Sequence, residues 1–240
     1  MFDRGMVEVV LYALLAGATI PIGAALASRS SLHKGWLESE VRHAVIGFGA
    51  GAMLAAVSFV LVPNAIAHVV HVEAAVFFFA GGVAFLFLDM VLSHIGGRFP
   101  QLFCMLADFI PESIALGAAF ATQAPGAHLL AILIAAQNLP EGFNAFREIV
   151  KSHPRSRSSL TFVFMLLVPL GPIAAVFGMM RLSQDPVLLA RLELAAAGGI
   201  LYLMFQDIAP TVPLRRHWWP SLGALGGFFV GILGMMLLHA

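Results

Sequence analysis

The sequence is poor in cysteine and in charged residues. A single cysteine, Cys104, excludes an intrachain disulfide framework and a cysteine-rich metal site. Charged residues make up only 11% of the 240 residues, whereas hydrophobic residues make up 60%. Charged residues usually make up about 25% of a water-soluble domain. The composition therefore predicts an all-α polytopic membrane protein.

Long apolar runs occupy nearly the whole chain. Runs of roughly 18 residues or more are candidate membrane-spanning helices. Eight such runs are expected, at residues 6–28, 43–67, 73–96, 102–123, 127–149, 159–181, 187–209 and 218–239. The first run is too long for a signal-peptide core and has no clear small-residue cleavage site, so a retained helix is expected. These runs predict one transmembrane domain over residues 1–240.

Basic residues gather on one side of this predicted topology. Ten of the 13 Lys and Arg residues fall in or beside the connections that follow the first, third, fifth and seventh runs. Cytoplasmic loops of membrane proteins collect Lys and Arg. Both termini are therefore predicted to lie outside, in a multi-pass protein of the bacterial inner (plasma) membrane.

One short pattern occurs twice, in the fourth and the fifth run. Residues 108–113 read Asp-Phe-Ile-Pro-Glu-Ser, and residues 137–142 read Gln-Asn-Leu-Pro-Glu-Gly. In a helix, Asp108 and Glu112 lie on one face, and so do Gln137 and Glu141, because each pair is four residues apart. Each proline also deprives the carbonyl four residues earlier of its usual N–H partner. The pattern favours two oxygen-rich sets around one ion, although Pro-Glu also suits an ordinary helix start.

Five acidic residues lie at membrane depth in these runs. They are Asp89, Asp108, Glu112, Glu141 and Asp207. On insertion scales, each ionised acid near a helix centre costs roughly 2.5 to 3.5 kcal/mol. Because every Lys and Arg lies at a helix end or in a loop, protons, water or a bound cation must offset this cost. A divalent ion that displaces protons from these carboxyls would bind in a pH-dependent manner.

Few other side chains could add ligands. Met53 in the second run carries the one soft donor atom, its sulfur, that could join an oxygen-rich set. A lone methionine more often fills core space. The turn after this run holds His68, His71 and Glu73, which could collect metal at an entrance or simply be solvated.

A weak internal repeat relates the second and the seventh run. Glycine precedes proline by 12 positions from Gly51 to Pro63 and again from Gly198 to Pro210. The two runs cross in opposite directions in the predicted topology. Helices 1–3 and 6–8 are therefore predicted to be inverted repeats, which is the build of secondary transporters with broken, ligand-bearing helices.

The two Pro-Glu cores in consecutive central runs resemble those of the ZIP (Zrt/Irt-like) family of metal transporters. The resemblance covers essentially the whole chain and implies eight transmembrane helices in a 3+2+3 arrangement. It further implies import of a divalent transition metal, usually zinc, toward the cytoplasm, with helices 4 and 5 binding the metal. The metal ligands that the resemblance implies are Asp108, Glu112, Gln137 and Glu141, with Met53, Asn138 and Asp207 as further members of the set.

Three departures from the family pattern bear on the metal. Asp108 stands where the family usually has His, so oxygen-preferring iron, manganese or magnesium compete with zinc, and cadmium is a further candidate. Phe109 stands where a ligating Asn is common, and Val168 stands where many members have Glu. Both losses fall on the second position of a two-metal centre, so the sequence predicts one metal ion in the site.

Two other functions stay open on the sequence alone. The same acids could serve an intramembrane acid-base or metal-dependent hydrolase, or the chain could bind metal without moving it. The duplicated spacing favours ion coordination, so we expect a transporter and not an enzyme. The expected partners are the metal ion as transported substrate and the lipid bilayer. A homodimer is left open, and no nucleic-acid partner is expected.

Overall fold

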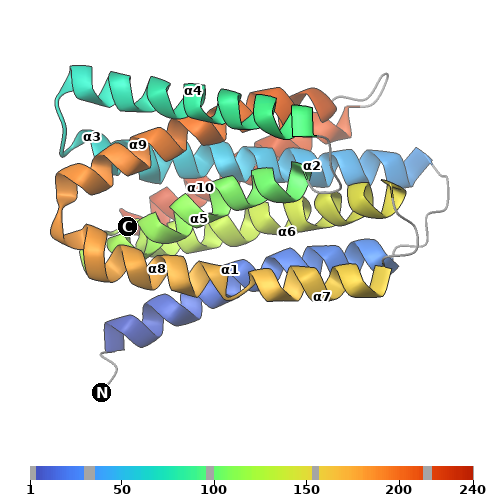
Figure 1. Ribbon diagram of the computed structural model, residues 1–240, viewed down its shortest axis with the longest axis horizontal. Coiled ribbons are helices and arrows are strands. Elements are labelled where there is room, and N and C mark those ends of the chain that lie inside the picture. Colours follow the sequence, from blue (N-terminus) through green and yellow to red (C-terminus); the bar gives the residue numbers. More distant parts are fainter. Residues whose placement is uncertain (1–3, 30–35, 96–99, 153–156, 213–217, 240) are drawn as a thin grey trace.

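The computed structural model describes residues 4–29, 36–95, 100–152, 157–212 and 218–239 (Figure 1). Those residues are almost entirely helical and include no strand, which confirms the all-α prediction. The elements are α1 (Arg4–Arg29), α2 (Trp36–Ala56), η1 (Val57–Leu61), α3 (Val62–Ile66), α4 (His71–Ile95), α5 (Pro100–Ala121), α6 (Ala127–Ser152), α7 (Arg157–Leu167), α8 (Leu170–Arg181), η3 (Leu182–Gln184), α9 (Pro186–Leu203), η4 (Met204–Ile208), η5 (Ala209–Thr211) and α10 (Trp219–Leu238). Long helices pair their own backbone groups, as an apolar surrounding requires.

The described elements join into eight helical rods, which fall close to the eight predicted runs. α2 continues through η1 into α3, and α9 continues through η4 and η5, whereas α7 and α8 are separated only by Val168 and Pro169. The rods lie side by side, and α10 ends at the end of the bundle where α1 begins (Figure 1).

Within the part of the chain that the structure describes, six helical segments are long and apolar enough to cross a membrane. They are Arg4–Arg29, Glu40–Ile66, His71–His94, Leu160–Gln184, Pro186–Thr211 and Trp219–Leu238. α5 and α6, with 22 and 26 residues, are not among the six; they carry the duplicated polar motif. The chain thus has the helices of a membrane protein.

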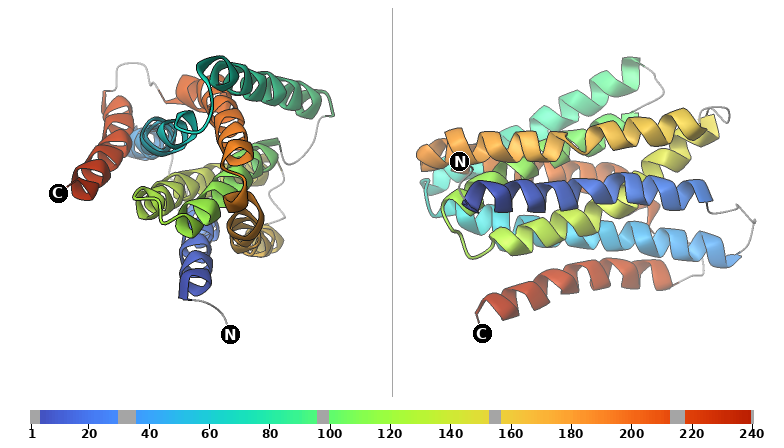
Figure 2. Two further views of the ribbon diagram at one scale, coloured as in Figure 1. Left: turned by 90° about the vertical axis from the view of Figure 1, so that its left-hand side faces the viewer. Right: turned by 90° about the horizontal axis from the view of Figure 1, so that it is seen from below.

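The two motif helices lie in the middle of the bundle. Viewed along the helices, α5 and α6 are surrounded by the others, whereas α4 and α10 lie at the edges (Figure 2). α10 buries only Pro220, Gly227 and Gly231, and α4 exposes large apolar side chains such as Phe79 and Phe87. Apolar surface of this kind suits a lipid surrounding, while the polar motif lies in the best-covered part of the molecule.

Each motif helix is packed tightly against one neighbour. A Cβ atom at Gly142 of α6 would overlap the carbonyl oxygen of Ile20 in α1. A Cβ atom at Gly117 of α5 would likewise overlap the carbonyl oxygen of Ala175 in α8. Small residues allow membrane helices to approach until their backbones touch. The positions of α5 and α6 are therefore fixed by α8 and α1.

Two π-helical segments interrupt the second and the seventh rod at matching positions. η1 and η4 are 147 positions apart, and so are Gly51 and Gly198, and Pro63 and Pro210. Each π segment ends two residues before its proline. Since proline has no N–H for the preceding turn, a wider turn relieves the unpaired carbonyl there. The local structure therefore follows the repeat that the sequence indicates for these two runs.

Candidate metal centre

The duplicated motif places five polar side chains inside the bundle. α5 supplies Asp108 and Glu112, and α6 supplies Gln137, Asn138 and Glu141. Three of them are completely buried, and Asp108 and Glu141 are only 3% and 8% exposed. Both helices continue through the proline at the centre of the motif. Burial of so many polar groups is costly unless each finds a partner.

One hydrogen bond connects the two motif helices. Nε2 of Gln137 donates to Oε2 of Glu112 over 2.6 Å. The bond leaves Oε1 of Gln137 and Oε1 of Glu112 without a hydrogen-bond partner. Gln137 therefore fixes the orientation of Glu112 while both side chains keep an oxygen for another ligand.

All five side chains keep at least one buried oxygen that accepts no hydrogen bond. These atoms are Oδ1 of Asp108, Oε1 of Glu112, Oε1 of Gln137, Oδ1 of Asn138, and both Oε1 and Oε2 of Glu141. An unsatisfied buried polar group costs about 1 to 3 kcal/mol, so folded proteins keep few of them. Their concentration within one short motif indicates a binding site for a group that accepts electron pairs.

The charges of the motif act on one another. Glu141 interacts electrostatically with both Asp108 and Glu112, and Asp108 interacts with Glu112. The three carboxyl groups, from two helices, are therefore close enough for the charge of each to affect the others. Like charges at close range repel, and a dication between them would reverse the sign of that interaction.

Asn138 points toward α1. Its Nδ2 donates to the carbonyl oxygen of Ala16 over 3.1 Å, while its Oδ1 has no partner. The amide is therefore held in place by a neighbouring helix. This contact adds α1 to the elements that support the motif.

The structure places the two outlying members of the predicted ligand set differently. Met53 is completely buried in α2. It lies one helical turn after Gly49, and Gly49 packs against the ring of Pro140 in α6. Met53 thus shares a helix face with the part of α2 that packs beside the α6 proline. Asp207 lies in η4 and is half-buried. It belongs to the seventh rod and not to the motif helices.

Phe109 fills the space between three helices. Its ring is completely buried, and its Cζ atom would lie 3.2 Å from a Cβ atom at Gly17 of α1 and 2.8 Å from one at Gly171 of α8. The same Cβ atom at Gly17 would lie 3.1 Å from the carbonyl oxygen of Val168. Phe109 and Val168 thus lie close together at Gly17, at the break between α7 and α8. Apolar packing occupies this position.

Among the described residues, no group of three or more His, Cys, Asp or Glu side chains is gathered closely enough to hold a metal ion. A metal ion bound to the motif would therefore need its two amide oxygens as well as its carboxylates. Carboxylate and amide oxygens are the ligands preferred by hard divalent ions and are also accepted by zinc.

Glu193 is a buried acid that sequence reasoning did not place in the membrane interior. It is 4% exposed in α9, and both of its carboxylate oxygens accept from Nδ2 of Asn64, at 3.0 and 2.9 Å. The sequence could have indicated this burial, because Glu193 stands six residues after the start of the seventh predicted run at residue 187. Unlike the motif acids, Glu193 has both oxygens satisfied.

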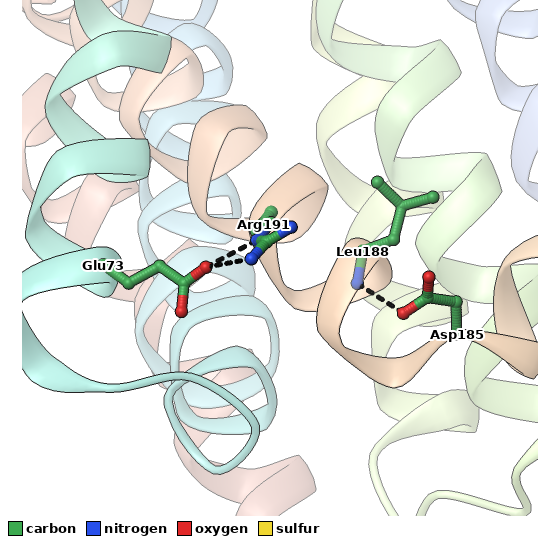
Figure 3. A network of polar contacts seen from close by, with 4 residues as sticks. All are labelled: Glu73, Asp185, Leu188 and Arg191. Carbon is green, nitrogen blue, oxygen red and sulfur yellow. Dashed lines mark hydrogen bonds and ion pairs between the residues drawn. The ribbon is translucent and has the colours of Figure 1, made fainter.

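Two other polar contacts tie α4 to α9. Glu73 forms an ion pair with Arg191, close to the start of α9, where Asp185 caps the helix by accepting from the backbone N–H of Leu188 (Figure 3). Further along the helices, the hydroxyl of Tyr202 donates to Oδ2 of Asp89 over 3.0 Å. Glu73 is therefore engaged by Arg191, which disfavours the alternative that it collects metal at an entrance together with His68 and His71.

The chain matches no protein-family model and no curated protein.

Proposed function

We propose that the protein transports a divalent transition metal across a membrane, using the α5–α6 motif as its binding site. The observation that carries this proposal is the set of buried oxygens without hydrogen-bond partners on five neighbouring motif side chains. A hydrolase would use acids as general acid and base and would need a route for a polymer or lipid substrate. A set of carboxylate and amide oxygens drawn from two helices suits the binding of an ion.

The proposed arrangement is that of the ZIP-like resemblance. Eight helices cross the membrane as a 3+2+3 array, with α5 and α6 as the central pair and the flanking rods as inverted repeats. The matching π segments support this arrangement for the second and the seventh rod. Both termini lie outside, as the distribution of Lys and Arg favours. The metal moves toward the cytoplasm, as the resemblance implies.

The proposed substrate is zinc, with iron, manganese and cadmium as competitors. The motif offers oxygens only, and Met53 is the soft donor proposed to join them. One ion occupies the site, because the position next to Asp108 is filled by the ring of Phe109, which has no ligand atom. Two strongly occupied ions beside Glu112 and Glu141 in the unmodified protein would contradict this stoichiometry, and anomalous diffraction would reveal them.

Uptake of radioactive zinc into proteoliposomes tests the function. We expect Glu112→Ala and Glu141→Ala to abolish uptake while folded protein remains in the membrane. The matched control is Asp89→Asn, which changes another acid of the bundle that Tyr202 already binds. Wild-type uptake by either motif variant would refute the assignment, as would equal loss in the Asp89→Asn control.

A further inference from the structure

A histidine and a glutamate meet near the beginnings of α1 and α6. Nε2 of His128, the second residue of α6, lies 3.4 Å from Oε1 of Glu8, the fifth residue of α1. Their side chains are 53% and 47% exposed, so water and dissolved ions reach both. The pair is separated by 120 positions in the sequence and is created only by the packing of the two helices.

The separation of the two atoms fits an ion pair and also fits two ligands of one metal ion. An N–H···O hydrogen bond usually measures about 2.7 to 3.2 Å between its heavy atoms. An ion with bonds of about 2.1 Å to two ligands in a tetrahedral arrangement holds those ligands about 3.4 Å apart. Imidazole nitrogen and carboxylate oxygen are both common ligands of divalent transition metals.

The imidazole ring is held in place by aromatic neighbours from two helices. It meets Tyr12 of α1 edge-on at 5.1 Å between ring centroids and Phe120 of α5 at 5.0 Å, with interplanar angles of 86° and 72°. Tyr12 and Phe120 in turn stack on each other at 5.2 Å. A ligand that is oriented before the metal arrives loses less conformational freedom on binding.

One face of α1 leads from this pair to the motif. Glu8, Tyr12 and Ala16 follow one another at four-residue spacing and therefore lie along the same side of the helix. Glu8 faces His128, Tyr12 contacts the same ring, and the carbonyl of Ala16 accepts from Asn138 of the motif. Eight residues of helix correspond to about 12 Å along its axis. The pair thus lies about two helical turns from the level of the proposed transport site.

We propose that Glu8 and His128 form a low-affinity loading site for the divalent transition metal, at the end of the bundle where α1 begins. This proposal rests on the proposed transport function for its direction, because that end is the outer one in the proposed topology. Two protein ligands with water completing the coordination sphere bind weakly, as a site that must pass its ion onward requires. The loading site raises the local concentration of metal above α5 and α6.

A binding experiment separates this site from the transport site. In full-length protein that carries Glu112→Ala and Glu141→Ala, calorimetric titration with Zn²⁺ should retain one weak equivalent. Adding either His128→Ala or Glu8→Gln should weaken that equivalent by at least about tenfold, since even indirect partners of metal ligands are worth about 10- to 100-fold in affinity. His94→Ala, which removes an exposed histidine near the end of α4, is the matched control and should change nothing.

An uptake experiment gives the second readout. In proteoliposomes with the motif intact, His128→Ala and Glu8→Gln should lower the initial rate at low zinc concentration and raise KM about tenfold. The maximal rate at saturating zinc should stay at the wild-type value, because the transport site is untouched.

The outcomes distinguish the two proposals. An unchanged weak equivalent together with an unchanged KM in both variants would overturn the loading site, leaving His128 and Glu8 as an ordinary ion pair. Wild-type uptake by Glu112→Ala or Glu141→Ala would overturn the transport function instead, while loss of the weak zinc equivalent in the titration would still support a surface metal site. A fall in the maximal rate with KM unchanged would also overturn the loading role, because it would place the pair in the translocation step.

Discussion

The α5–α6 pair and the contacts of α9 both bury acidic residues, but they treat these acids in opposite ways. Both oxygens of Glu193 accept from Asn64, and Asp89 accepts from Tyr202. In the motif, Gln137 donates to Glu112, but Asp108 and Glu112 each keep one buried oxygen without a partner, and Glu141 has two unsatisfied oxygens. Burial of an acid is therefore common to both regions, whereas the absence of a partner distinguishes the motif.

This difference shows how a structural acid is separated from a candidate ligand. A buried carboxyl that stabilises a helix contact is accompanied by its donor, because an unpaired group would destabilise the fold. A carboxyl kept for an ion has oxygens that the protein leaves unsatisfied. On this criterion Glu193 and Asp89 belong to the scaffold, and Glu112 and Glu141 are candidate ligands of the proposed site.

The strongest test of the comparison replaces one acid from each region by its amide. Glu141→Gln should weaken zinc binding at the motif by about 100-fold, since it removes a charged ligand from an oxygen-rich set. Glu193→Gln should leave zinc affinity unchanged, because the amide still accepts from Asn64. Calorimetric titration of both purified variants measures the difference. Equal losses of affinity in the two variants would remove the distinction between the regions.

Phe109 is where apolar packing enters the motif, so its removal should be costly to stability. Phe109→Ala would leave a cavity between α1, α5 and α8 and should lower the free energy of unfolding by about 3 to 5 kcal/mol. Thermal unfolding in detergent measures this loss, and Phe103→Ala, which truncates an exposed phenylalanine of the same helix, is the control. A melting temperature unchanged by Phe109→Ala would show that the ring does not hold these helices together.

A change of pH should alter zinc affinity at the motif, and the scaffold acid Glu193 should not contribute to this pH dependence. Protons and metal compete for the same carboxylates, so affinity should fall as pH is lowered from neutral to mildly acidic values. The expected slope is about tenfold per pH unit for each proton that the metal displaces. Glu193→Gln should show the same slope as the unmodified protein. A flat affinity over this range would contradict proton displacement.

The smallest effect is expected where a scaffold acid loses its donor. Tyr202→Phe removes the hydrogen bond to Asp89 and should destabilise the protein by about 0.6 kcal/mol, the mean value for side-chain hydrogen bonds between membrane helices. Zinc uptake should be the same as in the unmodified protein. A large loss of uptake in Tyr202→Phe would move Asp89 from the scaffold to the transport pathway.

The helices and the motif could be predicted from the sequence because both are local properties. Apolar runs of membrane length placed the rods, and four-residue spacing placed Asp108 with Glu112 and Gln137 with Glu141. The hydrogen-bond partner of each scaffold acid is not local: Asn64 lies 129 positions from Glu193, and Tyr202 lies 113 positions from Asp89. The residues around Asp89 do not reveal its partner, because that partner comes from α9. The pairing of Glu8 with His128 is hidden for the same reason.

The π segments η1 and η4 also have a consequence for how this sequence can change in evolution. A π turn is an α-helical turn with one inserted residue. When that residue is lost, the turn becomes α-helical and the helix on either side keeps the same residues buried. Deletions elsewhere in a packed helix rotate everything beyond them by about 100° and exchange buried for exposed side chains. Related sequences should therefore differ in length inside these two segments more readily than at any other point within the rods. A gap of one residue in an alignment at 57–61 or 204–208 would then record a change in helix type and not a misplaced helix.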